Sequence, residues 1–155
     1  MSVMGTDRWE EPAAWVAAGL LTGVGAFHAA VALGAPWGVL TQGGGTSGTL
    51  PVSGRLVAAV SCALSLLMAA AVLGRIGRGP FGARRSRIST VLAWLAVAYS
   101  ALAVVLNLLT RSAPERALWA PVSVLLLVLV SFVLVMSRHG RAAKHSSVHG
   151  WRTTA

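Results

Sequence analysis

The sequence predicts an all-α membrane protein, a bundle of four transmembrane helices with its N- and C-termini in the cytoplasm. Two features of the composition predict it: 55% of the 155 residues are hydrophobic and only 11% are charged, which is too apolar for a soluble domain of this length. The third observation is that four long apolar runs contain no Asp, Glu, Lys or Arg. At about 1.5 Å per residue, each run can cross a hydrocarbon core of roughly 30 Å.

These runs divide the chain into three parts. A cytoplasmic N-terminal segment covers residues 1–12, the transmembrane domain covers 13–136, and a basic tail that we expect to be disordered covers 137–155. Runs rich in Ala and Leu lack the alternation of a barrel strand, so helices are the spanning form that satisfies the backbone amides. The expected helices are 13–33, 56–73, 89–109 and 118–136.

The first helix is preceded by acidic residues rather than by the positive segment of a signal peptide, so we expect it to remain in the mature protein. Within it, Gly19 and Gly23 form a Gly-xxx-Gly pair. Small residues at this spacing let helix backbones approach closely. We interpret the pair as packing inside the bundle, with the seam of a homo-oligomer as the alternative.

The second and fourth helices contain the remaining local signals. Cys62 is the only cysteine and lies in the second helix, so the chain forms no intramolecular disulfide. Before the fourth apolar run, Ser112 and Glu115 have the spacing of a capping box, and Pro114 between them falls where a first helical turn tolerates proline. The fourth helix is therefore expected to begin before its apolar part.

The cations are distributed unevenly between the two sides of the predicted membrane. With the N-terminus inside, ten of the thirteen Lys and Arg residues lie in cytoplasmic segments, and three lie outside: Arg55, Arg111 and Arg116. This bias predicts the orientation. The second loop has no aromatic residues interleaved with its cations, as nucleic-acid stacking would need, so no nucleic-acid partner is expected. Its cations are predicted to contact anionic lipid headgroups: Arg75, Arg78, Arg84, Arg85 and Arg87.

Polar residues gather in the predicted outer half of the bundle. His28 lies about 7 Å below the outer end of the first helix, and Asn107 of the third helix lies at nearly the same depth. Intramembrane polar groups usually face the bundle interior and pair, so we expect a hydrogen bond between these two side chains. The candidate ligand-binding residues are this pair and the outer residues near it: His28, Trp37, Arg55, Asn107, Glu115 and Trp119.

Two segments of this region resemble a group of small four-helix bacterial integral membrane proteins that have no assigned activity. The first segment is His28…Gly34-Ala-Pro-Trp-Gly38…Gly43-Gly44…Leu50-Pro51…Arg55, and the second is Asn107…Ser112…Glu115-Arg116-x-x-Trp119-x-Pro121. The resemblance covers roughly residues 13–136. It implies the same four-helix fold and a location in the bacterial inner or plasma membrane, and it implies no reaction.

Two functional hypotheses follow. In the first, the outer residues form a pocket of a non-enzymatic protein that binds a small amphiphile or lipid headgroup. In the alternative, a membrane-embedded enzyme or small carrier uses His28 for proton transfer. Nucleophile-elbow and zinc-protease motifs are absent, and a solvated tail is favoured over a metal site for His139, His145 and His149. We therefore assign no catalytic residue, cofactor or metal.

Overall fold

The computed structural model describes residues 7–81 and 87–150, with the side chains of 9–81, 88 and 90–137. Every regular element in these ranges is helical, which confirms the predicted fold class. Four helices, each long and apolar enough to cross a membrane, are accompanied by two short 3-10 helices. In chain order they are α1 (Asp7–Leu33), η2 (Gly38–Leu40), η3 (Gln42–Gly44), α2 (Val52–Arg75), α3 (Arg87–Leu109) and α4 (Ala113–Gly150).

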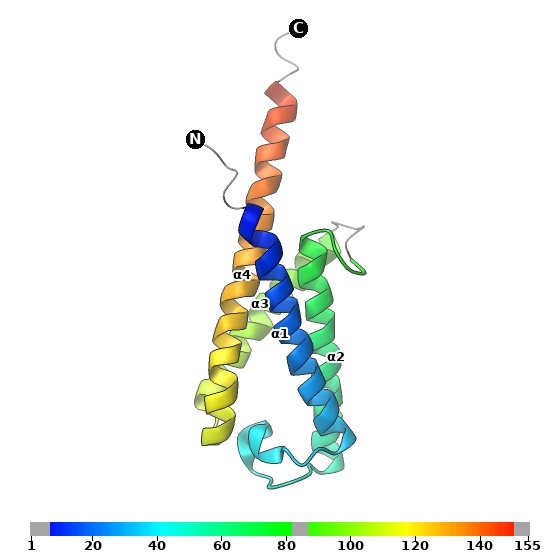
Figure 1. The fold of residues 1–155 in the computed structure, drawn as a ribbon, viewed down its shortest axis with the longest axis vertical. Coiled ribbons are helices and arrows are strands. Elements are labelled where there is room, and N and C mark those ends of the chain that lie inside the picture. The colour runs from blue at the N-terminus through cyan, green and yellow to red at the C-terminus, as the bar shows by residue number, and fades with distance from the viewer. Residues whose placement is uncertain (1–6, 82–86, 151–155) are drawn as a thin grey trace.

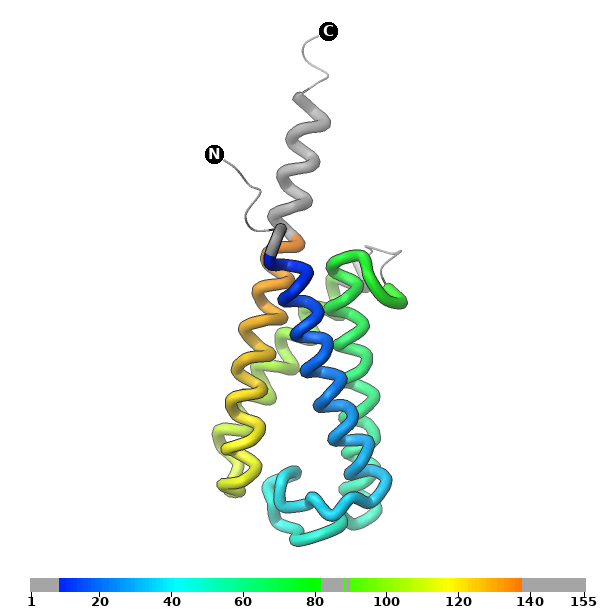
Figure 2. The backbone as a smooth tube through the Cα atoms, in the orientation of Figure 1, coloured from blue at the N-terminus to red at the C-terminus, as the bar shows by residue number. Residues whose placement is uncertain are grey.

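The helices run alternately up and down, so the connections lie at two ends of the bundle (Figure 1). At one end, here called the terminal end, α1 begins, α4 ends and residues 76–81 follow α2. At the other, the loop end, the α1–α2 connection with η2 and η3 lies near the short α3–α4 turn. The most extensive packing is between α1 and α2 and between α3 and α4. Figure 2 shows α1 and α4 close together near the terminal end and separated toward the loop end.

The apolar core is unevenly distributed along the bundle. Most of it lies in the half nearer the terminal end, where small residues of α1 allow close approach to buried Val and Leu residues of α4. The α1 residues are Ala14, Ala17, Ala18 and Leu21. At the loop end the buried apolar cluster is much smaller and consists of Val31, Leu50 and Ala58. The helices are therefore tightly packed at one end and leave space near the other.

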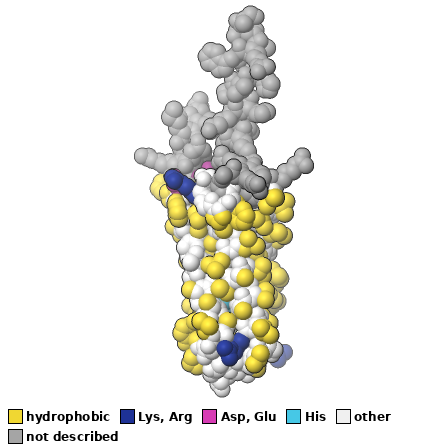
Figure 3. Space-filling view, turned by 90° about the vertical axis from the view of Figure 1, so that its right-hand side faces the viewer, with side chains coloured by type: hydrophobic (Ala, Val, Ile, Leu, Met, Phe, Trp, Pro, Cys, Tyr) yellow, Lys and Arg dark blue, Asp and Glu magenta, His cyan; other side chains and the backbone are white. Residues whose placement is uncertain are grey.

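The outer surface of the bundle suits lipid. Many large apolar side chains are exposed on all four helices, among them Trp15, Leu56, Val105 and Val128. In Figure 3 hydrophobic side chains cover the middle of the described surface, whereas Lys and Arg side chains lie near its two ends. In water so much exposed apolar area would favour aggregation, whereas in a bilayer it is the expected exterior.

The ends of α1 and α2 are determined by glycines. After α1, Gly34 has φ +108°, its N–H donates to Val31 O at 3.0 Å, and the Ala35 N–H donates to Ala30 O at 2.9 Å. After α2, Gly77 has φ +78° and the Arg78 N–H donates to the Leu73 carbonyl at 2.9 Å. These are the paired bonds of Schellman caps, whose left-handed residue is favoured as glycine. The predicted ends of the first and third helices, at residues 33 and 109, are confirmed.

The other helix limits differ from the predicted ones for local reasons. α2 begins at Val52 rather than at residue 56, because extended Pro51 precedes a turn in which the Arg55 N–H donates to Pro51 O. α4 begins at Ala113, as the capping signal predicted. α4 continues to Gly150, which lies within the segment 137–155 that was expected to be disordered. An existing helix extends at little cost through Ala, Arg, Lys and His, and no proline interrupts this segment.

The Gly-xxx-Gly pair of α1 does not pack inside the bundle. Gly19 and Gly23 are both exposed, and a Cβ added at either would meet no atom within 4 Å. The glycine of α1 that does pack internally is Gly25, whose added Cβ would lie 3.3 Å from Leu66 Cδ2 of α2. The interpretation of internal packing is therefore wrong for the pair, which lies on the outer surface of α1.

Arg75 is buried rather than available to lipid headgroups. Its side chain is 1% exposed, and its Nε and Nη2 donate to Ser137 Oγ of α4 at 3.0 and 2.7 Å. Its Nη1 donates to Thr90 Oγ1 of α3 at 2.9 Å. The prediction of a headgroup contact fails for this residue, since the last turn of α2 directs it between helices. Arg75 instead ties three helices together at the terminal end.

Candidate functional site

The α1–α2 connection folds across the loop end as an ordered structure. The Gly38 N–H donates to Gly48 O at 2.9 Å, which closes the connection on itself. Gln42 Nε2 donates to Gly54 O of α2 at 2.8 Å, and Arg55 Nε donates to Ala32 O of α1, also at 2.8 Å. Arg55 therefore satisfies a carbonyl near the end of α1, where backbone acceptors lack helical partners.

Three side chains from the α3–α4 turn and the first turns of α4 hold this connection from the opposite side of the bundle. Ser112 Oγ donates to Val39 O at 2.8 Å, and Trp119 Nε1 donates to Leu40 O at 2.8 Å. Glu115 Oε2 accepts the Gly43 N–H at 2.9 Å. We call this set of contacts the loop clamp: Ser112, Glu115 and Trp119 with Val39, Leu40 and Gly43.

The capping box predicted at the start of α4 is only half formed. Ser112 Oγ accepts the Glu115 N–H at 3.3 Å, as a cap should. The reciprocal bond is missing, because Glu115 Oε2 accepts the Thr110 hydroxyl at 2.6 Å and the Gly43 N–H. The Ser112 N–H instead approaches Thr110 Oγ1 at 3.4 Å. Glu115 therefore holds the loop to the turn.

Two glycines allow the loop to reach the turn. Gly43 has φ +84° and Gly44 has φ +68°, in the left-handed region that glycine adopts without steric cost. A Cβ added at Gly44 would contact Ser112 Cβ and lie 2.5 Å from Ser112 Oγ. Gly45, with φ −71°, would place a Cβ in open space. Of these three consecutive glycines, Gly43 and Gly44 are the ones at which another residue would be strained.

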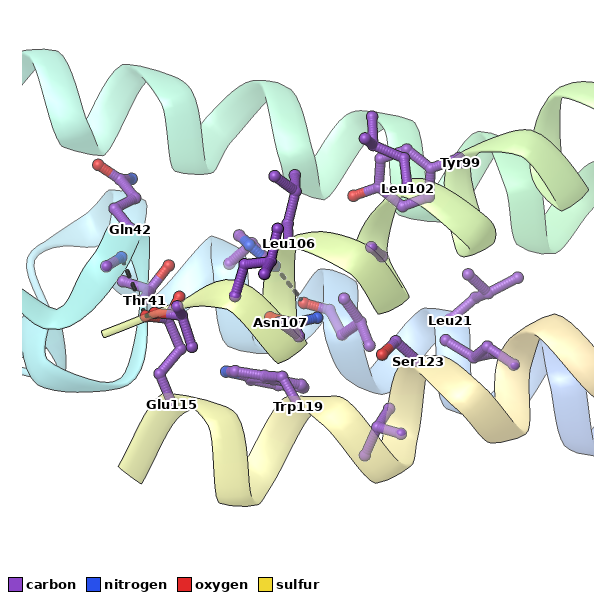
Figure 4. A pocket seen from close by; sticks show the side chains of 18 residues that line it. Leu21, Thr41, Gln42, Tyr99, Leu102, Leu106, Asn107, Glu115, Trp119 and Ser123 are labelled. Atoms are coloured by element: carbon purple, nitrogen blue, oxygen red, sulfur yellow. Dashed lines mark hydrogen bonds between the residues drawn. The ribbon is translucent and has the colours of Figure 1, made fainter. Parts of the chain in front are cut away.

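A cavity of about 500 Å³ lies beneath the loop, between α1, α3 and α4 (Figure 4). Its walls are mainly apolar side chains of the three helices, and residues 41–43 of the loop form its roof. None of its lining residues belongs to α2. Leu102 and Leu106 of α3 are 55% and 58% exposed, so the α3 wall is continuous with the lipid-facing surface. The lining side chains with polar groups are His28, Thr41, Gln42, Tyr99, Asn107, Thr110, Glu115, Trp119 and Ser123.

His28 and Asn107 line the same cavity, but the predicted hydrogen bond between them is not formed. His28 Nδ1 donates to Val24 O, one turn earlier in α1, at 2.9 Å. In the neutral ring this tautomer leaves Nε2 as an acceptor. The Asn107 amide makes no hydrogen bond with any residue that the structure describes. The pairing prediction is therefore wrong: His28 Nδ1 bonds within its own helix, and Asn107 does not bond to the remaining ring nitrogen.

Two of the six predicted site residues lie outside the cavity lining. His28, Asn107, Glu115 and Trp119 are brought together there, whereas Trp37 and Arg55 are not. Trp37 stacks on Phe27 at a centroid distance of 5.6 Å, and Phe27 meets Trp119 edge-on at 4.7 Å. Trp37 thus supports the loop-end aromatic cluster from outside.

Sequence reasoning missed several polar residues of the cavity. Thr41 and Gln42 belong to a glycine-rich loop whose fold is not evident from its pattern. Thr110 follows α3 directly and was not linked to the capping signal two residues later. Tyr99 of α3 packs against the main core and also lines the cavity. Tyr99 is the lone tyrosine of the chain, which was the available signal.

The cavity residues are not arranged as a metal centre. Within the described part of the chain, no group of three or more His, Cys, Asp or Glu side chains is placed to hold an ion. The side chains of His139, His145 and His149 lie outside the described residues. The cavity offers hydrogen-bonding groups, the carboxylate of Glu115 and the aromatic rings of Tyr99 and Trp119. Comparison of the chain with protein-family models, curated proteins and solved structures finds no match.

Proposed function

We propose that this protein is a non-enzymatic membrane protein that binds a small amphiphile in the loop-end cavity. The observation that supports it most directly is the joining of His28, Asn107, Glu115 and Trp119 in one cavity with otherwise apolar walls. A volume of about 500 Å³ lies within the usual range for small-molecule pockets, roughly 300–1,000 Å³. The apolar walls suit an alkyl or ring system, and the polar groups suit a head group.

The position of the cavity also favours a ligand that comes from the bilayer. Leu102 and Leu106 line the cavity and are more than half exposed on the side of α3. An amphiphile can thus reach the cavity laterally, while the loop clamp holds in place the roof that residues 41–43 form. The Asn107 amide and His28 Nε2 then offer hydrogen bonds to a head group at a depth where water is scarce.

Filling the cavity should remove this binding. Leu106→Trp adds bulk at the cavity wall. We expect it to reduce the amount of small molecule that co-purifies with the protein. Leu108→Trp is the matched control, because Leu108 is on the same helix, is 53% exposed and does not line the cavity. Native mass spectrometry of both variants and of the wild type measures the bound mass. Equal bound mass in all three proteins would contradict the proposal.

We also propose that the cavity faces the outer leaflet of the cell membrane, with both termini in the cytoplasm. The support is the charge bias of the sequence, ten cations against three, together with the position of the start of α1, the end of α4 and residues 76–81 at one end of the bundle. In this orientation Arg78, which is exposed and pairs with Glu11 at 3.2 Å, lies at the inner headgroup level. The side chains of Arg84, Arg85 and Arg87 lie outside the described residues.

Cysteine labelling should confirm the orientation. In a Cys62→Ser background, Gly45→Cys should react with a membrane-impermeant thiol reagent in intact cells, because Gly45 is exposed at the loop end with no atom near its Cβ position. Pro80→Cys, exposed at the terminal end, should react only after the membrane is permeabilised. The reverse pattern would place the cavity in the inner leaflet.

Two further proposals have weaker support. A second copy of the chain is the partner proposed for Gly19 and Gly23, because both are exposed on α1 and no described atom lies near their Cβ positions. The alternative function, an enzyme or small carrier that uses His28 for proton transfer, is supported by one observation. His28 and the carboxylate of Glu115 line the same cavity, although His28 Nδ1 is engaged by Val24 O.

A further inference from the structure

The charge inside the cavity is negative. Glu115 is the one lining residue among Asp, Glu, Lys and Arg. The residue is 7% exposed, so its charge is largely removed from solvent. Its Oε2 accepts the Thr110 hydroxyl at 2.6 Å, a short hydrogen bond. Glu115 also lies in the first turn of α4, at the positive end of the helix dipole.

The second oxygen of this carboxylate is left for another partner. Oε2 accepts both hydrogen bonds, from Thr110 and from the Gly43 N–H at 2.9 Å. Oε1 accepts no hydrogen bond from any residue that the structure describes, and Glu115 lines the cavity. Oε1 therefore remains able to accept a hydrogen bond from, or to pair with, a cationic group that enters the cavity, where charges interact more strongly than they do in water.

The arginines of the loop end do not supply that charge. Arg116 Nη1 donates to Thr110 O at 3.0 Å, and Arg55 Nε donates to Ala32 O at 2.8 Å. Neither lines the cavity, and neither does Arg111. The ion pair that the described side chains do form, between Arg78 Nη2 and Glu11 Oε1 at 3.2 Å, lies at the opposite end of the bundle. An anionic head group would thus meet a carboxylate and no cation, whereas a cationic one would meet its counter-ion.

An aromatic ring lies beside the carboxylate. Trp119 is four residues after Glu115 on α4, so both project from the same side of the helix into the cavity (Figure 4). The indole N–H is held by Leu40 O, which fixes the ring. The face of an indole attracts organic cations, and it does so more strongly in desolvated sites.

We propose that the cavity recognises the ammonium head of a singly cationic alkyl amphiphile, with Glu115 as its counter-ion, Trp119 as its aromatic wall and the apolar side chains of α3 and α4 around its tail. This inference rests on the proposed function, because it names the class of amphiphile that the same cavity binds. Leu106, Val122 and Leu126 are the tail contacts that it assigns.

The test compares three probes with the same alkyl chain, namely decylammonium, decanol and decanoate, on the purified full-length protein in a neutral maltoside detergent. Native mass spectrometry measures the apparent affinity of each probe for the wild type, Glu115→Gln and Glu11→Gln. Taking the ratio of wild type to variant for one probe removes differences in partitioning to micelles. Glu11→Gln is the matched control, since Glu11 is exposed at the terminal end.

We expect Glu115→Gln to weaken decylammonium binding by about tenfold or more, the loss of one hydrogen bond to a charged group. Glu115→Gln should leave the affinity for decanol unchanged. Glu11→Gln should change the affinity for neither decylammonium nor decanol. A second comparison does not require Glu115→Gln to fold: the affinity lost on Leu106→Trp should be largest for decylammonium and smallest for decanoate. If Leu106→Trp lowers the affinity for decanol but Glu115→Gln leaves the affinity for decylammonium unchanged, the cation proposal fails and the proposed function stands. If Leu106→Trp changes the affinity for none of the three probes, both the cation proposal and the proposed function fail.

Discussion

Gly44→Ala should lower the free energy of unfolding of the bundle by roughly 2–4 kcal/mol, the sum of a left-handed backbone cost and a steric overlap. Gly44 has φ +68°, and an added Cβ would contact the side chain of Ser112. The loop must then move away from the α3–α4 turn. Unfolding in mixed micelles with increasing sodium dodecyl sulfate, followed by circular dichroism, measures the change.

Gly45→Ala is the control for this prediction, because it makes the same chemical change one residue later. Gly45 has φ −71° and no atom within 4 Å of its Cβ position, so alanine there should be nearly neutral. Gly44→Ala should also reduce binding of small molecules, since residues 41–43 form the cavity roof. If both variants unfold at the same fraction of sodium dodecyl sulfate as the wild type, the close contact between loop and turn is not a source of stability.

Arg75→Lys is expected to have the second large effect, a loss of about 1–3 kcal/mol in the free energy of unfolding. Lysine keeps the positive charge but lacks the planar fork that donates to Ser137 and Thr90 together. The guanidinium of Arg75 is buried between α2, α3 and α4, so water cannot replace the lost bonds. The same unfolding assay measures the effect.

Arg78→Lys is the matched control, three residues further along the chain. The Arg78 side chain is 60% exposed and its pair with Glu11 is a surface ion pair, which usually contributes little to stability. We expect its unfolding curve to overlay that of the wild type. Equal effects of the two substitutions would mean that the burial of Arg75 is energetically unimportant.

The helical fold was predictable because it depends on local properties of the sequence. Long apolar runs without charges identify spans in any arrangement, and Gly34 directly after one run identifies the end of α1. Which face of each helix lies inside was not predictable from these signals. Gly19 and Gly23 have the spacing of an interface but lie outside, because the internal contact with α2 uses Gly25 instead.

The candidate site was predictable only as a region. The sequence predicted that His28 and Asn107 lie at the same depth in the membrane, and in the structure both line the same cavity. The contacts that close the cavity join segments more than seventy residues apart, such as Gly43 and Glu115, which are separated by 72 residues. The capping spacing of Ser112 and Glu115 indicated a helix start correctly, but it did not show that the carboxylate would turn to the loop.

The loop clamp also constrains the order in which the protein is assembled. Its bonds join residues 39–43 to residues 112–119, across separations of 72 to 79 positions. A chain that is inserted from its N-terminus during synthesis has made α1, the loop and α2 long before α4 leaves the ribosome. Until then the carbonyls of Val39 and Leu40 lack the partners that hold them, and the cavity has neither its α4 wall nor a fixed roof. The cavity is therefore completed only with the last helix, and a truncated or stalled product would lack it.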